Sequence, residues 1–298
     1  MNPIRLAVVG NPVAHSRSPQ IHARFAAASG HAVDYTRIEA PLDAFVAAVR
    51  AFADSGARGC NVTVPFKGEA FAACARLSER ARRAGAVNTI AFEADGWFGD
   101  NTDGAGLVRD IELNAGVPLR GRRVLLLGAG GAAAGALEPL LAARPAALVV
   151  ANRTPDKALQ MIARFAADAA RLEVPLSATG LETAGGDFDV LVNATAASLQ
   201  AAVPPLPAGT LRPGALALDM MYGTATRPFL DWARAQGAVA RDGLGMLVEQ
   251  AAEAYLVWLG VRPQTFQVLT DLRREVDAQA AATLAAAASR AAAPGAAA

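Results

Sequence analysis

The stretch Arg123-Val124-Leu125-Leu126-Leu127-Gly128-Ala129-Gly130-Gly131-Ala132-Ala133 decides the fold expected of this chain. An apolar strand over 123–127 runs into glycines that open a helix from about Ala132, which fits the G-x-G-x-x-G/A fingerprint with Ala133 in the third small position. Gly128 permits the tight turn, Gly130 lets the backbone approach a pyrophosphate, and Ala133 lets the helix pack closely on the strand. The N–H groups and dipole of a helix N-terminus favour negative charge. A dinucleotide is therefore predicted to bind at Gly128, Ala129, Gly130, Gly131 and Ala132.

The end of the next strand, Leu148 to Ala151, indicates which dinucleotide is bound. An acidic residue about 20 positions after the glycines would bind the ribose 2′-hydroxyl of NAD, and this chain has no acid there. It reads Asn152-Arg153-Thr154-Pro155-Asp156-Lys157, whose amide, guanidinium, hydroxyl and ammonium suit a phosphate. The predicted cofactor is NADP(H), held by Asn152, Arg153, Thr154 and Lys157. Thr154 also fits a helix N-cap before Pro155, and Lys157 also fits a solvated helix charge.

Around this segment, strands alternate with helices, which is the pattern of a Rossmann-type domain expected over residues 104–246. The pattern predicts a helix over Gly104 to Asn114, another over Asp156 to Ala170, and strands near Val190 to Asn193 and Ala215 to Asp219.

The preceding residues 1–103 repeat the alternation, which predicts a second α/β domain with a mainly parallel sheet. Its expected strands are Ile4 to Val9, Val33 to Ile38 and Gly59 to Val64, and its expected helices are Pro19 to Ala28 and Leu42 to Ser55. Helical segments within 247–276 are expected to return to this domain. The alanine-rich tail 277–298 is expected to be a frayed helix or disordered. The fold class is therefore α/β with two domains.

Composition excludes several classes of function. With 28 Lys and Arg against 27 Asp and Glu, the net charge is +1, so no broad basic field exists for nucleic acid or an anionic membrane. The two cysteines have neither the number nor the spacing of a disulfide framework or a zinc site, so no metal is expected.

The first apolar run is broken at Gly10 and therefore predicts a strand rather than a signal peptide. No membrane span is expected, and the chain is predicted to be cytoplasmic, as a monomer or homodimer.

Four motifs in the first domain place polar side chains at strand ends or helix starts, where ligands bind open α/β sheets. They are His15-Ser16-Arg17-Ser18-Pro19, Asn61-Val62-Thr63-Val64-Pro65-Phe66-Lys67, Ala86-Val87-Asn88-Thr89 and Asp100-Asn101-Thr102-Asp103-Gly104. Together they suit a small hydroxylated acid. Each also has a structural interpretation, since Ser18 and Asp103 could cap helices and Lys67 could be an ordinary loop charge.

The motifs and the NADP fingerprint together resemble the shikimate dehydrogenase family, which interconverts 3-dehydroshikimate and shikimate in aromatic amino acid biosynthesis. The resemblance extends to about Val276 and includes Asp219-Met220-Met221-Tyr222 and the stretch from Asp242 to Ala251. It implies that Ser16, Ser18 and Tyr222 bind the substrate carboxylate, and that Thr63, Asn88, Asp103 and Gln250 bind ring hydroxyls. It further implies that Lys67 and Asp103 are the catalytic pair, and that Met220, Gly243 and Met246 line the nicotinamide pocket.

The chain departs from the family pattern at two places. Asn193-Ala194-Thr195-Ala196-Ala197-Ser198 replaces the usual Asn-Ala-Thr-Ser followed shortly by glycine, and Ala134 stands where many members have arginine. Neither departure removes a proposed catalytic group. The alternatives are a paralogue that also oxidises quinate or uses NAD, and a non-catalytic NADP-sensing protein on the same fold. The presence of both Lys67 and Asp103 argues against the second alternative.

Overall fold

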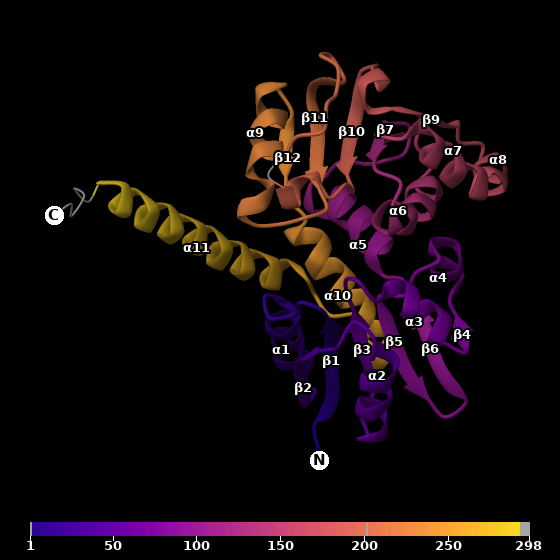
Figure 1. The fold of residues 1–298 in the computed structure, drawn as a ribbon, viewed down its shortest axis with the longest axis vertical. Helices are drawn as coiled ribbons and strands as arrows, with labels where there is room; N and C mark the ends of the chain where they lie inside the picture. Colours follow the sequence, from indigo (N-terminus) through magenta and orange to yellow (C-terminus); the bar gives the residue numbers. More distant parts are fainter. Residues whose placement is uncertain (1, 201, 293–298) are drawn as a thin grey trace.

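The computed structural model describes residues 2–200 and 202–292 and arranges them as two lobes, each built on a six-stranded sheet (Figure 1). A helical layer between the sheets joins the lobes. The α/β fold class expected from the sequence is confirmed.

The sheet of the first lobe has the strand order β2-β1-β3-β5-β6-β4. Strands β1, β2 and β3 are parallel, whereas β5 runs antiparallel to both of its neighbours. The strands are β1 (Ile4–Gly10), β2 (Val33–Glu39), β3 (Gly59–Val62), β4 (Arg76–Leu77), β5 (Thr89–Glu93) and β6 (Gly96–Asp100). Strand β3 ends two residues before the predicted Val64, because Pro65 has no N–H for the ladder.

Helices cover both faces of this first sheet. They are α1 (Ser18–Ser29), α2 (Phe45–Asp54), α3 (Lys67–Ala73) and α4 (Glu79–Ala84). Successive side chains of β1 point to opposite faces of the sheet. Ala7 and Val9 belong to a core cluster with α2 and α3, while Leu6 and Val8 pack with Trp258 on the other face.

The sheet of the second lobe is parallel throughout, with the order β12-β11-β10-β7-β8-β9. Counted within the lobe, this is the doubly wound order of a Rossmann fold, whose strand order reverses between β7 and β10. The strands are β7 (Arg123–Leu127), β8 (Ala147–Asn152), β9 (Leu176–Gly180), β10 (Phe188–Asn193), β11 (Leu211–Asp219) and β12 (Val239–Arg241).

The helices of the second lobe include one break that the sequence pattern did not predict. They are α6 (Gly131–Ala142), α7 (Pro155–Arg164), α8 (Ala166–Leu172) and α9 (Arg227–Ala235), with short 3₁₀ turns η2 (Leu181–Thr183), η3 (Ala197–Gln200) and η4 (Thr224–Thr226). The single helix predicted over Asp156 to Ala170 is two helices. The break falls at the fully buried Phe165, whose φ of −110° is not helical.

Two helices link the lobes. Helix α5 (Asp103–Arg109) continues as the π-helix η1 (Asp110–Asn114), and it packs side by side with α10 (Leu244–Leu259). Helix α10 starts at the second lobe and runs into the first (Figure 1), where the Trp258 indole donates to the Ile90 carbonyl at 2.9 Å.

The last helix, α11 (Phe266–Ala292), continues well beyond the predicted end of the helical pattern at Val276. The part of the tail up to Ala292 is therefore helical rather than disordered, because alanine is the best helix former and no proline interrupts the run before Pro294. Residues 293–298 lie outside the described residues. Buried Val268, Leu272 and Val276 dock the start of α11, and its far end points away from both lobes (Figure 1).

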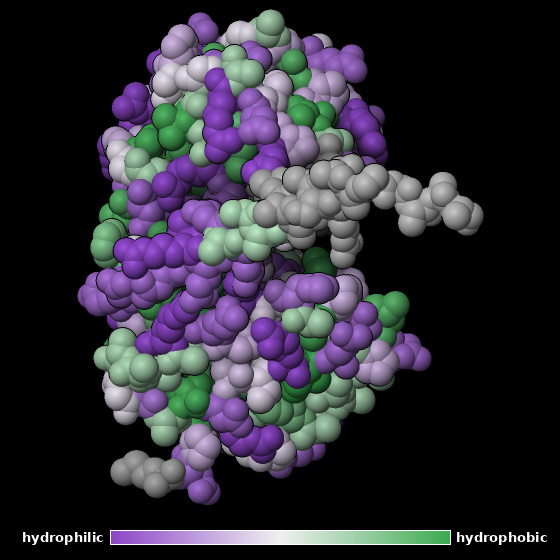
Figure 2. Space-filling view, turned by 90° about the vertical axis from the view of Figure 1, so that its left-hand side faces the viewer, coloured by the Kyte–Doolittle hydropathy of each residue, from purple (hydrophilic) through white to green (hydrophobic). Residues whose placement is uncertain are grey.

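The surface in Figure 2 has a hydrophilic band across its middle, with hydrophobic residues in small separate groups above and below it. In the described part of the chain, no helix combines the length and apolarity that crossing a bilayer requires.

Candidate active site

Lys67 and Asp103, which are 36 residues apart in the sequence, form an ion pair. Lys67 opens α3 and Asp103 opens α5, and the Lys67 Nζ donates to Asp103 Oδ2 at 2.5 Å. Their side chains are 30% and 14% exposed, so the pair is accessible to a small molecule yet largely shielded from water. Both follow the carboxyl ends of strands, β3 and β6, where open α/β sheets bind ligands.

Asn88 orients the other oxygen of the same carboxylate. Its side-chain amide donates to Asp103 Oδ1 at 2.8 Å and to Thr102 Oγ1 at 2.9 Å, while its carbonyl accepts from the Thr102 backbone N–H at 2.9 Å. Gln250 of α10 joins this group, because its Oε1 lies 3.3 Å from both the Asn88 amide and the Thr102 hydroxyl. The structure thus brings four of the predicted substrate residues together: Lys67, Asn88, Asp103 and Gln250.

The two serines of the first motif lie beside each other at the start of α1. Ser16 Oγ is 3.2 Å from Ser18 Oγ, and the Arg37 Nε donates to the Ser16 carbonyl at 3.0 Å, which fixes the loop. The helix begins at Ser18 itself, with Arg17 in the N-cap position. Ser18 therefore does not cap α1, and Asp103, which is the first residue of α5, does not cap that helix either. Neither side chain is therefore used to cap its helix.

Thr63 and Tyr222 are not linked to the other predicted residues by a hydrogen bond in the described structure. Thr63 is half-buried directly after β3. Tyr222 lines a cavity of about 670 Å³ together with Arg17 and Met221. Burial raises the pKa of the Tyr222 phenol, and the positive charge of Arg17 partly offsets this rise.

The glycine-rich turn has the shape that a bound pyrophosphate needs. Gly128 has a φ of +107°, in a region that favours glycine. Gly130 is the N-cap of α6, and a Cβ at Gly130 or Gly131 would meet no atom within 4 Å, so their backbone faces open space. Ala129 is half-buried and Ala132 exposed beside this open surface. The residues present therefore fit a dinucleotide phosphate.

The predicted 2′-phosphate residues lie together at the carboxyl end of β8. The Asn152 amide donates to the Thr154 carbonyl at 2.9 Å, which shapes the turn into α7. Arg153, Thr154 and Lys157 are exposed. Thr154 occupies the N-cap position, yet its hydroxyl makes no capping hydrogen bond. The described structure gives Arg153 and Lys157 no carboxylate partner within 4.0 Å, so both charges face solvent.

Of the predicted nicotinamide residues, Met220 directly follows β11, Gly243 directly precedes α10, and Met246 lies in the first turn of α10. A Cβ at Gly243 would lie 2.3 Å from the Met220 carbonyl oxygen, so only glycine allows this close approach. Met220 is half-buried, while Met246 is 7% exposed and packs in the core of the second lobe.

Two further residues, which the sequence reasoning did not assign, hold this region. Buried Asp219 accepts from the Asn193 amide at 2.9 Å and from the Met221 backbone N–H at 2.9 Å. Ser198 also donates to Asp219, and so anchors the loop in which the chain departs from the family pattern. Burial raises the pKa of Asp219, although hydrogen bonds from Ser198 and Met221 oppose this. The other departure, Ala134, is buried in α6.

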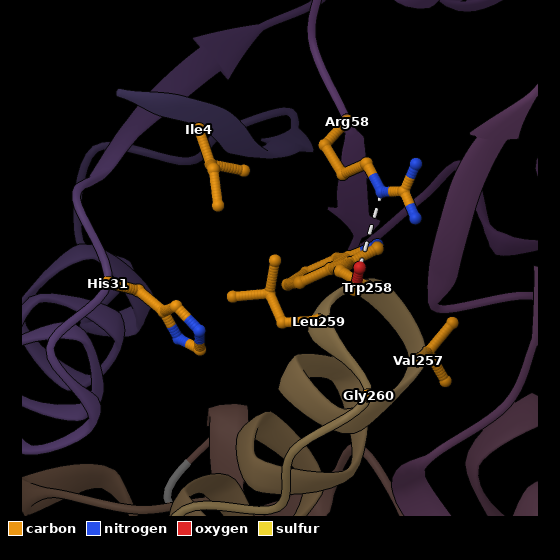
Figure 3. Close-up of a pocket in the computed structure, with 7 residues that line it drawn as sticks. All are labelled: Ile4, His31, Arg58, Val257, Trp258, Leu259 and Gly260. Carbon is orange, nitrogen blue, oxygen red and sulfur yellow. Dashed lines mark hydrogen bonds between the residues drawn. The ribbon is translucent and has the colours of Figure 1, made fainter. Parts of the chain in front are cut away.

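A second hollow, of about 690 Å³, lies away from these residues (Figure 3). Ile4, His31 and Arg58 surround the last turn of α10, and the Arg58 Nε donates to the Trp258 carbonyl at 3.2 Å. Ile4 marks the amino end of β1, whereas the polar cluster lies at the carboxyl ends of the strands. None of the predicted site residues lines this hollow.

A Rossmann-type lobe joined to a lobe with a paired lysine and carboxylate defines a class, the dinucleotide-dependent oxidoreductases of small polar substrates. The model of the shikimate dehydrogenase substrate binding domain matches residues 8–90, and that of shikimate / quinate 5-dehydrogenase matches residues 112–202. The chain belongs to the shikimate dehydrogenase family.

Relatives named shikimate dehydrogenase (NADP(+)) match almost the whole chain. The protein of Methylibium petroleiphilum is 59% identical over 279 residues, covering 92% of this chain and 95% of the relative. That of an Acidovorax species is 56% identical over 273 residues, covering 92% and 97%.

Solved structures agree with these relatives. An Ael1 enzyme from Pseudomonas putida has a TM-score of 0.84 at 50% identity, covering 90% of this chain and 98% of its own. The Thermus thermophilus shikimate 5-dehydrogenase in complex with shikimate has a TM-score of 0.77 at 34% identity, covering 92% and 99%. A shikimate dehydrogenase in complex with NADP⁺ has a TM-score of 0.80 at 28% identity, covering 92% and 96%.

Proposed function

We propose that this chain catalyses the NADP(H)-dependent, reversible reduction of 3-dehydroshikimate to shikimate, a step of aromatic amino acid biosynthesis. Family membership and relatives of 56–59% identity that are named for this activity support the reaction. The observation that carries the proposal at the residue level is the contact between Lys67 and Asp103 at the carboxyl ends of the strands.

The substrate is held at two ends. Ser16, Ser18 and Tyr222 bind its carboxylate, which is supported by the adjacent serine hydroxyls and by the cavity that Arg17 and Tyr222 line together. A second group of residues binds the ring hydroxyls, and the cluster around the Asp103 carboxylate offers both donors and acceptors for these hydroxyls. The residues of this group are Thr63, Asn88, Asp103 and Gln250.

Lys67 and Asp103 carry out the proton chemistry. When bound, NADP(H) supplies or accepts the hydride. Reduction of a carbonyl develops negative charge on its oxygen, which the Lys67 ammonium stabilises and to which it can donate a proton. Asp103 holds the ammonium in place through Oδ2 and orients the reacting hydroxyl.

The cofactor lies across the second lobe. The backbone from Gly128 to Ala132 binds the pyrophosphate, which the open space above Gly130 and Gly131 supports. Asn152, Arg153, Thr154 and Lys157 bind the 2′-phosphate, while Met220, Gly243 and Met246 line the nicotinamide pocket. The exposed, carboxylate-free Arg153 suits a planar, bidentate contact with phosphate.

The state of the two thiols supports a cytoplasmic location. Cys60 and Cys74 are free, and burial raises the pKa of both, that of Cys74 to about 12, so they stay protonated and unreactive. Unpaired thiols are typical of a reducing compartment, which supports a cytoplasmic location. We further propose that the enzyme is a monomer or homodimer.

The experiment that tests this function follows the absorbance of the reduced nicotinamide with shikimate and quinate against NADP⁺ and NAD⁺. Shikimate with NADP⁺ is expected to give the highest kcat/KM, by about 10-fold or more over each other pair. A higher value with quinate, or with NAD⁺, would replace the proposal with the paralogue that the sequence left open. No turnover with any pair would support the non-catalytic alternative.

A further inference from the structure

Three buried polar residues lie on the face of the first sheet that packs against α1 and α10. They are Tyr35 on β2, Asn61 on β3 and Thr89 on β5, with exposed fractions of 9%, 5% and 0%. Asn61 and Thr89 are direct cross-strand partners, so their side chains point to the same face. The Tyr35 phenol reaches across β1 to the Asn61 side chain. Figure 1 shows β1, β3 and β5 side by side.

These residues form a continuous series of hydrogen bonds that ends at the Asp103 carboxylate. Tyr35 donates to Asn61 Oδ1 at 2.7 Å, and the Asn61 amide donates to Thr89 Oγ1 at 3.0 Å. The Thr89 hydroxyl donates to Asn88 Oδ1 at 3.0 Å. The Asn88 amide then donates to Asp103 Oδ1 at 2.8 Å, opposite the Lys67 contact on Oδ2.

The chemistry of the groups fixes the direction of the series. An amide nitrogen can only donate and an amide oxygen can only accept, and each asparagine side chain faces one backbone group of fixed kind. The Asn61 amide donates to the Asn88 backbone carbonyl at 3.2 Å, and Asn88 Oδ1 accepts from the Thr102 backbone N–H at 2.9 Å, so neither side chain can turn over without losing its backbone bond. Burial raises the pKa of Tyr35 well above its ordinary value, so the phenol stays a donor. His22 packs flat against the Tyr35 ring, with centroids 4.3 Å apart, and burial lowers the pKa of His22 to about 3, so no charge enters beside the phenol.

We propose that Tyr35, Asn61 and Thr89 are positioning residues for catalysis: together with the Thr102 backbone N–H, their hydrogen bonds hold the Asn88 amide in the orientation that points a donor at Asp103. This inference rests on the proposed function, because it assigns a role through the Lys67–Asp103 pair. All three reach the Asp103 carboxylate only through Asn88. Aligned donors in a buried series polarise one another, so the last donor to the carboxylate depends on the first.

The first test compares Tyr35→Phe with Tyr255→Phe. Tyr255 is a matched control, since it is also a buried tyrosine near His22, and its hydroxyl contacts Ser29 and His31 instead of the series. Tyr35→Phe is expected to lower kcat for shikimate oxidation by about 10- to 100-fold, the usual effect of removing a group that orients a catalytic one. The KM for NADP⁺ and the midpoint of thermal unfolding are expected to change no more than in Tyr255→Phe.

The second test breaks the series in the middle. Thr89→Val keeps the branched shape but loses the hydroxyl, whereas Thr89→Ser keeps the hydroxyl and is expected to restore kcat to within about 3-fold of the unaltered chain. The double variant Tyr35→Phe with Thr89→Val is expected to match the worse single variant rather than the product of both losses, because both cut one series.

The outcomes separate the two proposals. If the unaltered chain oxidises shikimate and Tyr35→Phe loses no more kcat than Tyr255→Phe, the positioning role is wrong and the proposed function stands. The same holds if Thr89→Ser is as slow as Thr89→Val, or if the two losses multiply. If the unaltered chain gives no turnover with shikimate, the proposed function fails, and the positioning role fails with it.

Discussion

At the scale of single residues, each oxygen of the Asp103 carboxylate has its own hydrogen-bond donor. Asp103 Oδ2 accepts from the Lys67 ammonium and Oδ1 accepts from the Asn88 amide. Charge-assisted hydrogen bonds of this kind are roughly twice as strong as neutral ones, so the carboxylate is fixed from both sides. The ammonium can therefore be aimed at a substrate oxygen without relying on substrate contacts to hold it.

A residue-scale prediction concerns the choice of cofactor. Arg153→Ala removes the exposed guanidinium proposed to bind the 2′-phosphate, so the Kd for NADPH is expected to rise by about 10- to 100-fold, as for loss of a charge-assisted contact. The Kd for NADH, which has no 2′-phosphate, is expected to change less than 3-fold. Fluorescence titration of both reduced cofactors measures this.

The control for that titration is Arg171→Ala, which removes an exposed arginine of α8 in the same lobe. It is expected to leave both cofactors unaffected. Equal losses of NADPH and NADH binding in Arg153→Ala would contradict the 2′-phosphate assignment.

The sequence was sufficient to predict most residues of the polar cluster, but not the side chains that hold them in place through hydrogen bonds. The roles of Lys67, Asn88, Asp103 and Gln250 were predicted from the resemblance to the family, and the four side chains lie together in the structure. Thr102 and Asn61 stand inside the quoted motifs, yet their contacts depend on strand register and so could not be predicted. Tyr35 lies in none of the motifs. Its hydrogen bond to Asn61 spans β1, which lies between their two strands, so it depends on the strand order of the folded sheet.

At the scale of elements, Glu249 fastens α10 to its neighbours. The side chain is 1% exposed and accepts from Arg109 and Asn114 at 3.2 Å each, from Arg262 at 2.6 Å and from Thr265 at 2.7 Å. These donors come from α5, from η1 and from the connection into α11. One carboxylate of α10, next to Gln250, therefore binds α5, η1 and the connection into α11.

This contact makes stability depend on pH. Burial alone would raise the pKa of Glu249, but hydrogen bonds from Thr265 and Arg262 outweigh it and leave the pKa lowered. Below the ordinary value of 4.5, the unfolded chain takes up the proton before the folded chain does. The contribution is therefore present above that value and is lost as the pH falls through the folded pKa.

Glu249→Gln cannot titrate, so the free energy of unfolding is expected to fall less steeply between about pH 5 and pH 3 than in the unaltered chain. At neutral pH the variant is expected to lose about 1–3 kcal/mol, because buried charged hydrogen bonds are replaced by neutral ones. Urea unfolding at several pH values measures both effects, with the exposed Glu182→Gln as the control. An unchanged slope in Glu249→Gln would disprove the linkage.

The predictability of elements followed the strength of the local pattern. Strand β7 has the predicted bounds, Arg123–Leu127, because a buried parallel strand is a continuous apolar run. The short strands β9 and β12 were missed, and so was the hairpin of β5 and β6, whose Ala94-Asp95 loop precedes Gly96. The break between α7 and α8 depends on where Phe165 is buried, which local sequence does not reveal.

At the scale of the whole molecule, the two lobes divide the proposed work. Lys67 opens α3 after a strand of the first sheet, and Asp103 opens α5 after another strand of that sheet. The glycine turn and Arg153 follow strands of the second sheet. Helix α10 spans both, carrying Met246 near its start and Gln250 one turn later. A change in one lobe can therefore remove chemistry without removing cofactor binding, and the reverse.

The central claim is that the Lys67 ammonium performs proton chemistry on a substrate oxygen while the other lobe binds the dinucleotide independently. The most direct test measures kcat and the NADPH Kd of Lys67→Ala side by side, with Arg153→Ala as the reciprocal variant. We expect Lys67→Ala to lower kcat by about 10² to 10⁴ with the Kd within about 2-fold of the unaltered chain. Turnover by Lys67→Ala at the rate of the unaltered chain would contradict the account.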